Sequence, residues 1–360
     1  MLPPAADAGS FVIANTVLSN LGCINSEQRS QYWAKLRRRG VKAIEASSLT
    51  KSFGAVRALD NFDLTVTAGT ICALLGPNGA GKTTAIRILA TLTRPDAGTA
   101  SVAGHDIARQ AALVRGCIGL AGQHAAVDDD LTGRENLAIL GLMHHLGRRA
   151  AWRRADELLA EHGLADAAGR LVKTWSGGMR RRLDLLASLI VRPAVLFLDE
   201  PTTGVDPRSR AAIWSSVRSL AATGTTVLLT TQYLDEADRL AADVVIMKAG
   251  RAVASGSPDA LKDTIGTSVL VAVEDAADLP AAAAVASRWA SRPPFVDTEQ
   301  LRLTARIAAG SVTLPELVRH LEAAGVRAQD VSFRRPTLDE VFLDRTGDSA
   351  RDKAATEAVA

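Results

Sequence analysis

One segment of the chain, Gly76-Pro-Asn-Gly-Ala-Gly-Lys82-Thr83, strongly limits the folds that the sequence can adopt. It follows a short apolar run, Ile71–Leu75, that predicts a buried strand, and it precedes Thr84–Ala90, which predicts a helix. A glycine-rich loop in this context lets backbone N–H groups wrap around phosphate oxygens. Lys82 adds a point charge for the β- and γ-phosphates, and the Thr83 hydroxyl can hold Mg²⁺. The segment therefore predicts a nucleotide-binding α/β fold.

Composition narrows the class of protein further. The chain has 360 residues, enough for about two domains, and its formal net charge at pH 7 is only +3. Aromatic residues make up 4% of the sequence, and no basic stripe interleaves with them, so we expect no nucleic-acid partner. The cysteines Cys23, Cys72 and Cys117 are far apart, which favours reduced thiols in a cytoplasmic protein.

The sequence carries no signal for membrane insertion. The apolar run Leu137–Met143 is far shorter than the roughly 20 residues that cross a bilayer, and two histidines follow it. The N-terminus lacks the basic region and apolar core of a secretory signal. We therefore expect any role at a membrane to depend on a separate partner.

Hydrophobic periodicity predicts a parallel sheet covered by helices, preceded by an antiparallel hairpin. Residues 124–190 are predicted to be mostly helical. Strands are predicted at 43–66 as a hairpin, and at 71–75, 98–103, 114–121, 194–198 and 225–230, with closing edge strands at 244–247 and 251–254. The expected fold class is α/β, a P-loop NTPase sheet with an antiparallel β subdomain and a helical subdomain.

A break at Gly256–Pro258 separates this region from a second domain. The rest of the chain alternates in the order β-α-β-β-α-β, which is typical of a small α+β domain of the ferredoxin-like type. Its elements are expected at 268–273, 280–290 (helix), 295–298, 300–306, 314–324 (helix) and 327–333. The predicted domains are a loosely ordered extension 1–42, a nucleotide-binding domain 43–260, an accessory domain 266–347 and a disordered tail 348–360.

Two carboxylates follow the buried run 194–198. Asp199 is placed to reach Mg²⁺ directly or through water, and Glu200 to orient or deprotonate the attacking water. General-base catalysis is worth roughly 10² to 10⁴ in rate. We therefore predict that a Glu200→Gln protein loses most of its hydrolysis.

A second candidate anion site precedes another predicted helix. Ser176, Gly177 and Gly178 form a backbone nest at the start of that helix. Because the first loop of the same chain already binds the phosphates, this second nest suggests a nucleotide shared between two molecules.

These motifs, in this order and with this spacing, make residues 43–255 similar to the nucleotide-binding subunit of an ATP-binding cassette (ABC) transporter. Gly76–Thr84 resemble the Walker A loop of that family, and Asp199 with Glu200 resemble its Walker B pair. Ser176–Gly178 resemble the signature that closes over the γ-phosphate of the partner's ATP.

The resemblance also implies roles for isolated residues. Asp206 matches the aspartate of the D-loop, and Gln123 matches the Q-loop glutamine that contacts Mg²⁺ and couples the site to the membrane subunit. Phe53 stands where the family usually stacks an aromatic ring on adenine, although a phenylalanine in the hairpin core remains the alternative. The expected nucleotide contacts are Phe53, Gly76, Pro77, Asn78, Gly79, Ala80, Gly81, Lys82, Thr83, Thr84, Gln123, Ser176, Gly177, Gly178 and Asp206. The expected metal contacts are Thr83, Gln123 and Asp199, and the expected catalytic residues are Glu200, Lys82 and Gln232.

Two positions depart from the family pattern. Gln232 takes the place of the usual switch histidine; its amide can donate a hydrogen bond to the γ-phosphate, but it cannot become cationic. We predict that turnover is retained, with Glu200 as the chief water-activating residue. Trp175 stands where leucine is commonest, and we interpret it as a bulky apolar residue that packs under the signature nest.

Three further segments, Ser176–Asp184, Thr230–Ala237 and Pro336–Leu343, resemble the daunorubicin-resistance type of ABC exporter ATPase. This resemblance implies an ATPase that uses ATP and Mg²⁺ and exports a hydrophobic or amphipathic, antibiotic-like compound. It further implies a head-to-tail homodimer and a separate transmembrane permease, which would place the subunit on the cytoplasmic face of the cell membrane.

Two alternative functions remain open: transport of lipid or polysaccharide, and a soluble ABC ATPase without a transport role. The segment after Gln123, including Asp128–Asn136, is expected to pass energy to the permease. A solvated loop is the alternative interpretation of its three adjacent aspartates.

Overall fold

The structure, a computed structural model, describes residues 40–122, 127–308 and 310–346. The chain divides into two compact units, Met1–Val253 and Ala254–Ala360. Most of the predicted extension 1–42, the predicted tail 348–360 and Gln123 lie outside the described residues. No helix in the described ranges is both long enough and apolar enough to span a bilayer.

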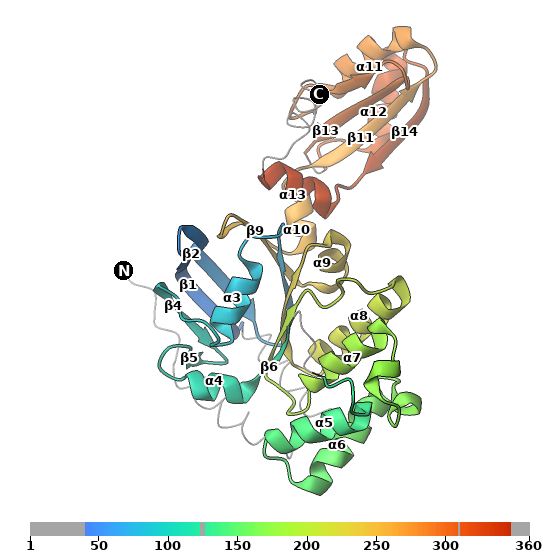
Figure 1. The fold of residues 1–360 in the computed structure, drawn as a ribbon. Coiled ribbons are helices and arrows are strands. Elements are labelled where there is room, and N and C mark those ends of the chain that lie inside the picture. Colours follow the sequence, from blue (N-terminus) through green and yellow to red (C-terminus); the bar gives the residue numbers. More distant parts are fainter. Residues whose placement is uncertain (1–39, 123–126, 309, 347–360) are drawn as a thin grey trace. The chain divides into compact units, whose positions relative to one another are not determined.

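A six-stranded sheet forms the centre of the first unit (Figure 1). In sheet order its strands are β10 (Arg251–Gly256), β9 (Asp243–Lys248), β3 (Ile71–Leu75), β8 (Thr226–Thr231), β7 (Val195–Asp199) and β6 (Ile118–Ala121). Strands β9, β3, β8, β7 and β6 pair in parallel. The residues of β3, β7 and β8 are all buried, as expected for parallel strands covered on both faces.

An antiparallel sheet packs beside this parallel sheet. Its order is β2 (Val56–Thr67), β1 (Lys42–Phe53), β4 (Ala97–Val102) and β5 (His105–Asp106). The predicted hairpin is therefore confirmed as β1 and β2. One continuous apolar core includes Phe62 from β2, Ile86 from the helix after β3, and Phe197 from β7.

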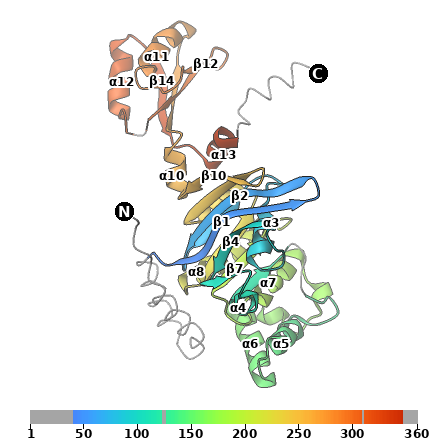
Figure 2. The same ribbon diagram turned by 90° about the vertical axis from the view of Figure 1, so that its left-hand side faces the viewer.

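Helices cover the sheets and form a separate helical part. They are α3 (Lys82–Leu89), α4 (Ala111–Cys117), α5 (Gly133–Met143), α6 (Arg148–Glu161), α7 (Gly177–Ala187), α8 (Pro207–Ala222) and α9 (Leu234–Leu240), with the short 3₁₀ turns η2 (Ala165–Ala167) and η3 (Val172–Thr174). Figures 1 and 2 show α5 and α6 side by side at one end of this unit. Helix α6 buries Ala151, Ala155 and Leu158, the spacing of an amphipathic helix.

Two strand predictions were wrong. Residues 114–117 belong to α4, and only Ile118–Ala121 form a strand. Ala111, Ala112 and Leu113 form helices readily. Val114 is buried on that helix, so the apolar pattern continues across the boundary between the helix and the strand. The run 244–247 is not an edge strand, because β9 lies between β3 and β10, and only β10 is at the edge.

The second unit contains an antiparallel sheet with helices packed against it. It comprises α10 (Pro258–Asp263), β11 (Thr267–Val273), η4 (Ala276–Asp278), α11 (Leu279–Ala286), β12 (Phe295–Asp297), β13 (Arg302–Ile307), α12 (Leu314–Ala323), β14 (Ala328–Arg334) and α13 (Leu338–Thr346). The sheet order is β12-β13-β11-β14, and every pair is antiparallel. The β-α-β-β-α-β order agrees with the prediction. Helix α11 ends earlier than predicted, because the chain turns after Ala286 and Ala290 bridges Ile307.

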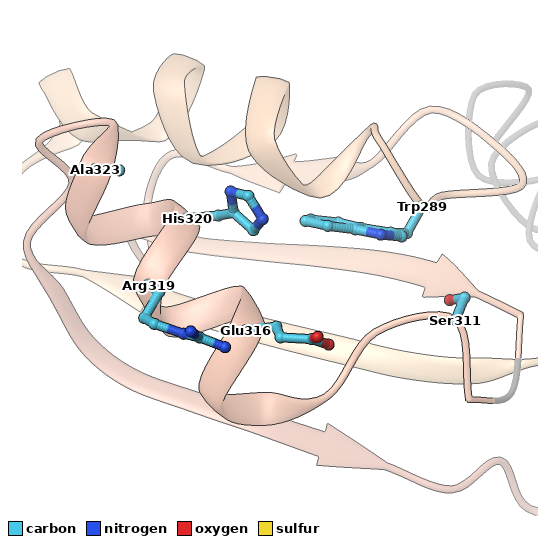
Figure 3. Close-up of a pocket in the computed structure, with 6 residues that line it drawn as sticks. All are labelled: Trp289, Ser311, Glu316, Arg319, His320 and Ala323. Carbon is cyan, nitrogen blue, oxygen red and sulfur yellow. The ribbon is translucent and has the colours of Figure 1, made fainter.

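A cavity of about 460 Å³ lies on this second unit (Figure 3). It is lined by Trp289, Ser311, Glu316, Arg319, His320 and Ala323. The rings of Trp289 and His320 lie 5.2 Å apart between centroids. Glu316 caps its own helix by accepting from the N–H and hydroxyl of Thr313, and Arg319 donates to the carbonyl one turn earlier. These two polar groups of the cavity therefore serve to form α12.

Candidate functional site

The strand register brings three predicted motifs to one edge of the parallel sheet. Leu75 of β3 lies beside Thr231 of β8, and Asp199 of β7 lies beside Thr230. The loops that follow these strands therefore start next to one another, at the carboxyl ends where α/β proteins bind ligands. This edge carries the glycine-rich loop, the Asp199–Glu200 pair and Gln232.

Lys82 is the cation at the centre of this edge. Its side chain is only 4% exposed, and its ammonium donates to the carbonyls of Gly76 at 2.7 Å and Pro77 at 3.2 Å. The ammonium also lies 3.5 Å from Glu200 Oε1. Because a buried ammonium is stable only among oxygen partners, this one is held in position for an anionic ligand at the loop.

Two glycines of the loop have no room for a side chain. A Cβ on Gly76 would lie 2.6 Å from the carbonyl oxygen of Met247, and one on Gly81 would lie 2.4 Å from that of Ala58. Gly81 also has φ of 102°, in the left-handed region that favours glycine. The loop backbone therefore runs close against neighbouring strands while Pro77, Asn78 and Gly79 stay exposed. This arrangement fits a backbone cradle for phosphate.

Hard oxygen ligands for a divalent cation lie directly beside the loop. The Thr83 hydroxyl, on the first turn of α3, donates to Asp199 Oδ1 at 3.1 Å. Thr230 Oγ1 donates to the same carboxylate oxygen at 2.6 Å, which fixes its orientation. A hydroxyl, a carboxylate and the phosphates of a nucleotide are the donors that Mg²⁺ prefers, so the residues present fit this ion.

Glu200 occupies an uncommon backbone conformation. Its φ is 51°, which few residues other than glycine adopt. Its N–H donates to the carbonyl and the hydroxyl of Thr230, at 3.2 and 3.0 Å. Thr203 donates to Glu200 Oε2 at 3.2 Å. The turn after β7 therefore presents the carboxylate beside Lys82 instead of continuing the strand.

The signature segment is built differently. Ser176 is exposed, and its hydroxyl caps α7 by accepting from the N–H of Met179. Gly177 is exposed as well, whereas Gly178 lies against α8, where an added Cβ would meet Ser209. Among the described residues, Ser176, Gly177 and Gly178 themselves make no hydrogen bond or ion pair to Gly76–Thr84, Asp199 or Glu200. The exposed N–H groups at the start of α7 can therefore bind an anion from outside the chain.

Trp175, the residue before this segment, is a buried bulky residue, and its packing beneath the nest stays a prediction. It is 4% exposed, and the ring of Trp175 fills the space where a Cβ on Gly133 would lie, with ring carbons 2.5 Å from that position. Gly133 begins α5, whose N-terminus is closed by a capping box between Thr132 and Glu135. The tryptophan thus joins the signature segment to α5.

Asp206 and Phe53, two more predicted contacts, lie on exposed surface. Asp206 caps α8 by accepting from the N–H groups of Arg208 and Ser209, and the hydrogen bonds from Ser209 hold the pKa of that carboxyl below its usual range. Phe53 ends β1 and is 52% exposed, with the Lys51 ammonium 5.5 Å from its ring centroid. An exposed ring is free to stack on a base, and the hairpin-core interpretation of Phe53 is wrong.

Two aspartates of the loop before α5 form ion pairs with residues on either side of the signature, Lys173 before it and Arg180 in α7. Asp130 lies 2.9 Å from the Lys173 ammonium, and Asp129 lies 3.4 Å from Arg180. Asp128 accepts through its carbonyl from the Asn136 amide at 2.9 Å. All three aspartates are exposed and such ion pairs contribute little energy, so the solvated-loop interpretation and the predicted role in coupling to the permease both stay open.

Comparison with known proteins settles the family. The chain is 53% identical over 317 residues to the daunorubicin resistance ATP-binding protein DrrA2 of Streptomyces coeruleorubidus, a match that covers 88% of this chain and 98% of that protein. The chain belongs to the ABC transporter family. The family model described as ABC transporter matches residues 59–203.

A second relative and a solved structure agree with this assignment. The ABC ATPase is 48% identical over 322 residues to the daunorubicin/doxorubicin resistance ATP-binding protein DrrA of Streptomyces peucetius, covering 88% of this chain and 96% of that protein. The structure of an ATP-binding subunit of an ABC transporter superimposes with a TM-score of 0.56 at 27% identity, covering 62% of this chain and 92% of that chain. The predicted fold class is confirmed, and the chain is an ATP-binding, ATP-hydrolysing enzyme.

The sequence analysis did not predict a role for one buried acid of the ABC ATPase, Glu236. Glu236 is fully buried in α9, and its Oε1 accepts from the Thr202 hydroxyl at 3.1 Å and from the Trp214 indole N–H at 2.9 Å. Burial raises the pKa of this carboxyl, while hydrogen bonds from Thr231, Trp214 and Thr202 oppose the rise. Glu236 thereby links the helix after Gln232 to the segment after Glu200. Because a glutamate is rarely fully buried, no local pattern in the sequence indicated this link.

Proposed function

We propose that this ABC ATPase drives export of a hydrophobic or amphipathic, drug-like compound through a separate membrane permease. The observation that carries the proposal is the match along nearly the whole length of two daunorubicin resistance ATP-binding proteins. A subunit without a candidate membrane-spanning helix among its described residues needs a permease to move cargo. The proposed location is therefore the cytoplasmic face of the cell membrane.

The proposed roles of the Walker residues follow from their positions. Lys82 binds the β- and γ-phosphates against the loop backbone, and Phe53 stacks on the adenine. Thr83 and Asp199 hold Mg²⁺, which neutralises charge on the phosphates when bound. Glu200, beside Lys82 and 12% exposed, orients or deprotonates the attacking water. Gln232 follows Thr231 at the same edge and donates its amide to the γ-phosphate; Gln123 stays a predicted contact.

The exposed signature segment supports a shared site. Two copies of the chain, joined head to tail, would place Ser176, Gly177 and Gly178 of one copy over the γ-phosphate bound to the other. Asp206 lies beside Gly178 and would face the same interface, since the place of a Cβ on that glycine is 3.3 Å from its carboxylate. ATP binding would then close the interface, and hydrolysis would weaken it.

The test is to purify the ABC ATPase together with a permease encoded beside its gene, to place the complex in lipid vesicles, and to measure ATP hydrolysis with and without daunorubicin. We expect daunorubicin to stimulate hydrolysis and to be moved across the vesicle membrane only in the presence of ATP. A complex that contains Glu200→Gln is the control, and it should bind ATP without transport. Stimulation by lipid or polysaccharide with no response to amphipathic drugs would overturn the drug assignment, and indifference to the permease would count against transport.

A further inference from the structure

One arginine on α7, the helix that begins at the signature and is called the signature helix below, contacts backbone carbonyls at and after the Walker B carboxylates. Arg181 lies in α7, and its side chain is 15% exposed. Its Nη2 donates to the carbonyls of Asp199 at 3.1 Å and Glu200 at 3.0 Å. Its Nε donates to the carbonyl of Pro201 at 3.0 Å. A single guanidinium therefore holds three consecutive carbonyls at the carboxyl end of β7.

The same guanidinium also reaches a third segment. Its Nη1 donates to the carbonyl of Gly122 at 2.7 Å and to Asp184 Oδ2 at 3.4 Å. Gly122 follows β6 and immediately precedes Gln123 in the chain. Arg181 therefore connects the signature helix, the Walker B end and the start of the predicted Q-loop. The planar fork of a guanidinium suits such a junction, because it presents several donors in fixed directions.

The backbone that Arg181 holds is the one with the uncommon conformation. Glu200 has φ of 51°, and its N–H is fixed by Thr230 on β8. Arg181 binds the carbonyl of the same residue, so both polar groups of its backbone are held. A residue in a sparsely populated region of φ and ψ persists where the surrounding structure over-determines it.

We propose that Arg181 is a positioning residue for ATP hydrolysis, which sets the place of the Glu200 carboxylate relative to the signature helix and to Gly122. If the signature helix or the segment at Gly122 moved, the guanidinium of Arg181 would then shift the Glu200 backbone with it. The proposal rests on the proposed catalytic role of Glu200, and the experiment below separates the two. The proposal predicts that loss of Arg181 lowers the rate of turnover and leaves ATP binding intact.

The experiment compares Arg181→Ala with Arg154→Ala in the ABC ATPase bound to its permease. Arg154 is a matched control, because it is 13% exposed and also donates to backbone carbonyls, those of Leu189 and Ile190, without a contact to the end of β7. The measurements are kcat, KM, equilibrium binding of ATP and the midpoint of thermal unfolding. Misplacement of a catalytic group can cost about 10²-fold, and we expect a fall of about that size in kcat for Arg181→Ala alone.

A chemical readout separates positioning from general stability. Millimolar guanidinium ion should restore part of kcat to Arg181→Ala, whereas urea at the same concentration should not, and Arg154→Ala should respond to neither. Arg181→Lys keeps the charge and most of the volume, so it should fold normally and remain slow. Wild-type kcat in either Arg181 variant, or a loss of kcat that only follows lost ATP binding or unfolding, would overturn the proposal.

Glu200→Gln serves as the reference for the function itself. If this variant hydrolyses ATP at the wild-type rate, the catalytic role of Glu200 is wrong, and the Arg181 proposal is wrong with it. If Glu200→Gln is inactive while Arg181→Ala turns over normally, only the Arg181 proposal is wrong.

Discussion

The two ends of the predicted nucleotide site differ in how completely one chain builds them. At the Walker end, Lys82, Asp199 and Glu200 converge at the edge of the parallel sheet and are held by hydrogen bonds from neighbouring elements. At the signature end, Ser176 and Gly177 are exposed, and the serine hydroxyl caps its own helix. A buried, interconnected site needs nothing further to keep its shape. An exposed helix start above a buried tryptophan is suited to meet another surface, which agrees with the proposed head-to-tail pair.

Complementation of two inactive variants tests this difference with the largest expected effect. Lys82→Ala removes the cation of the Walker end, and Ser176→Arg blocks the signature end. Loss of a transition-state donor costs roughly 10² to 10³ in rate, so each variant alone should be nearly inactive. When the two are mixed, the pair contains one intact site, built from the loop of the Ser176→Arg chain and the signature of the Lys82→Ala chain.

ATPase measurements on titrated mixtures of the two proteins check this prediction. Activity should rise to a maximum near equal amounts of the two variants. A mixture of Lys82→Ala with Glu200→Gln is the control and should stay inactive, because both changes lie on the same side of the site. Full activity of Ser176→Arg by itself, or no recovery in the mixture, would show that the two ends do not complete each other between chains.

The packing of Trp175 against Gly133 provides a second test, on the support of the signature end. A Cβ on Gly133 would meet the indole ring, and overpacking a core typically costs about 1–3 kcal/mol. Gly133→Ala should therefore lower the free energy of unfolding, measured by urea denaturation. In a Trp175→Leu background the smaller side chain leaves room, and the same change should cost less by about 0.5–3 kcal/mol, the usual coupling between residues in contact. Strict additivity of the two changes would contradict the contact.

Glu236 gives the smallest effect and sharpens the description of the Walker end. Burial raises the pKa of this carboxyl above its ordinary 4.5, so the folded protein holds the proton more tightly than the unfolded chain. The stability from this group is fully present below pH 4.5 and is lost as the pH rises through the folded-state pKa. Glu236→Gln keeps the acceptor for Thr202 and Trp214 but does not titrate.

The expected result is a pH-dependent difference between the two proteins. Above pH 4.5, the free energy of unfolding of Glu236→Gln should rise relative to wild type, with a slope of at most about 1.4 kcal/mol per pH unit. Urea denaturation at a series of pH values measures it. A constant difference across that range would mean that burial at this position does not perturb the carboxyl.

The sequence predicted which helices and strands exist better than it predicted the residues at which they begin and end. Strands β3, β7 and β8 were predicted because continuous apolar runs bounded by loops have few other solutions. Helix α4 was not predicted because a buried residue of the helix, Val114, is followed closely by the buried residues of strand β6. The hydrophobic pattern does not show where the helix ends and the strand begins. The position of β9 inside the sheet depends on pairing between segments far apart in sequence, which no local pattern encodes.

The candidate site divides in the same way. The residue types at Lys82, Thr83, Asp199 and Glu200 could be assigned from motifs, because each chemical role demands a particular side chain at a particular spacing. Arg181 and Glu236 could not, because an arginine in a helix and an acid in the first turn of a helix are ordinary surface residues in a sequence. Their importance arises from carbonyls and side chains that other elements bring to them.

By itself the sequence determined the chemistry of the phosphate loop, the acidic strand end and the anion nest, since these depend on residue type and short spacing. Only the tertiary structure decided which of them share one edge of a sheet, that the ring of Trp175 packs against Gly133, and how Glu200 is held in its uncommon conformation. The physical reason is that local patterns record what each segment can do, whereas burial and long-range hydrogen bonds are fixed only when distant segments pack together.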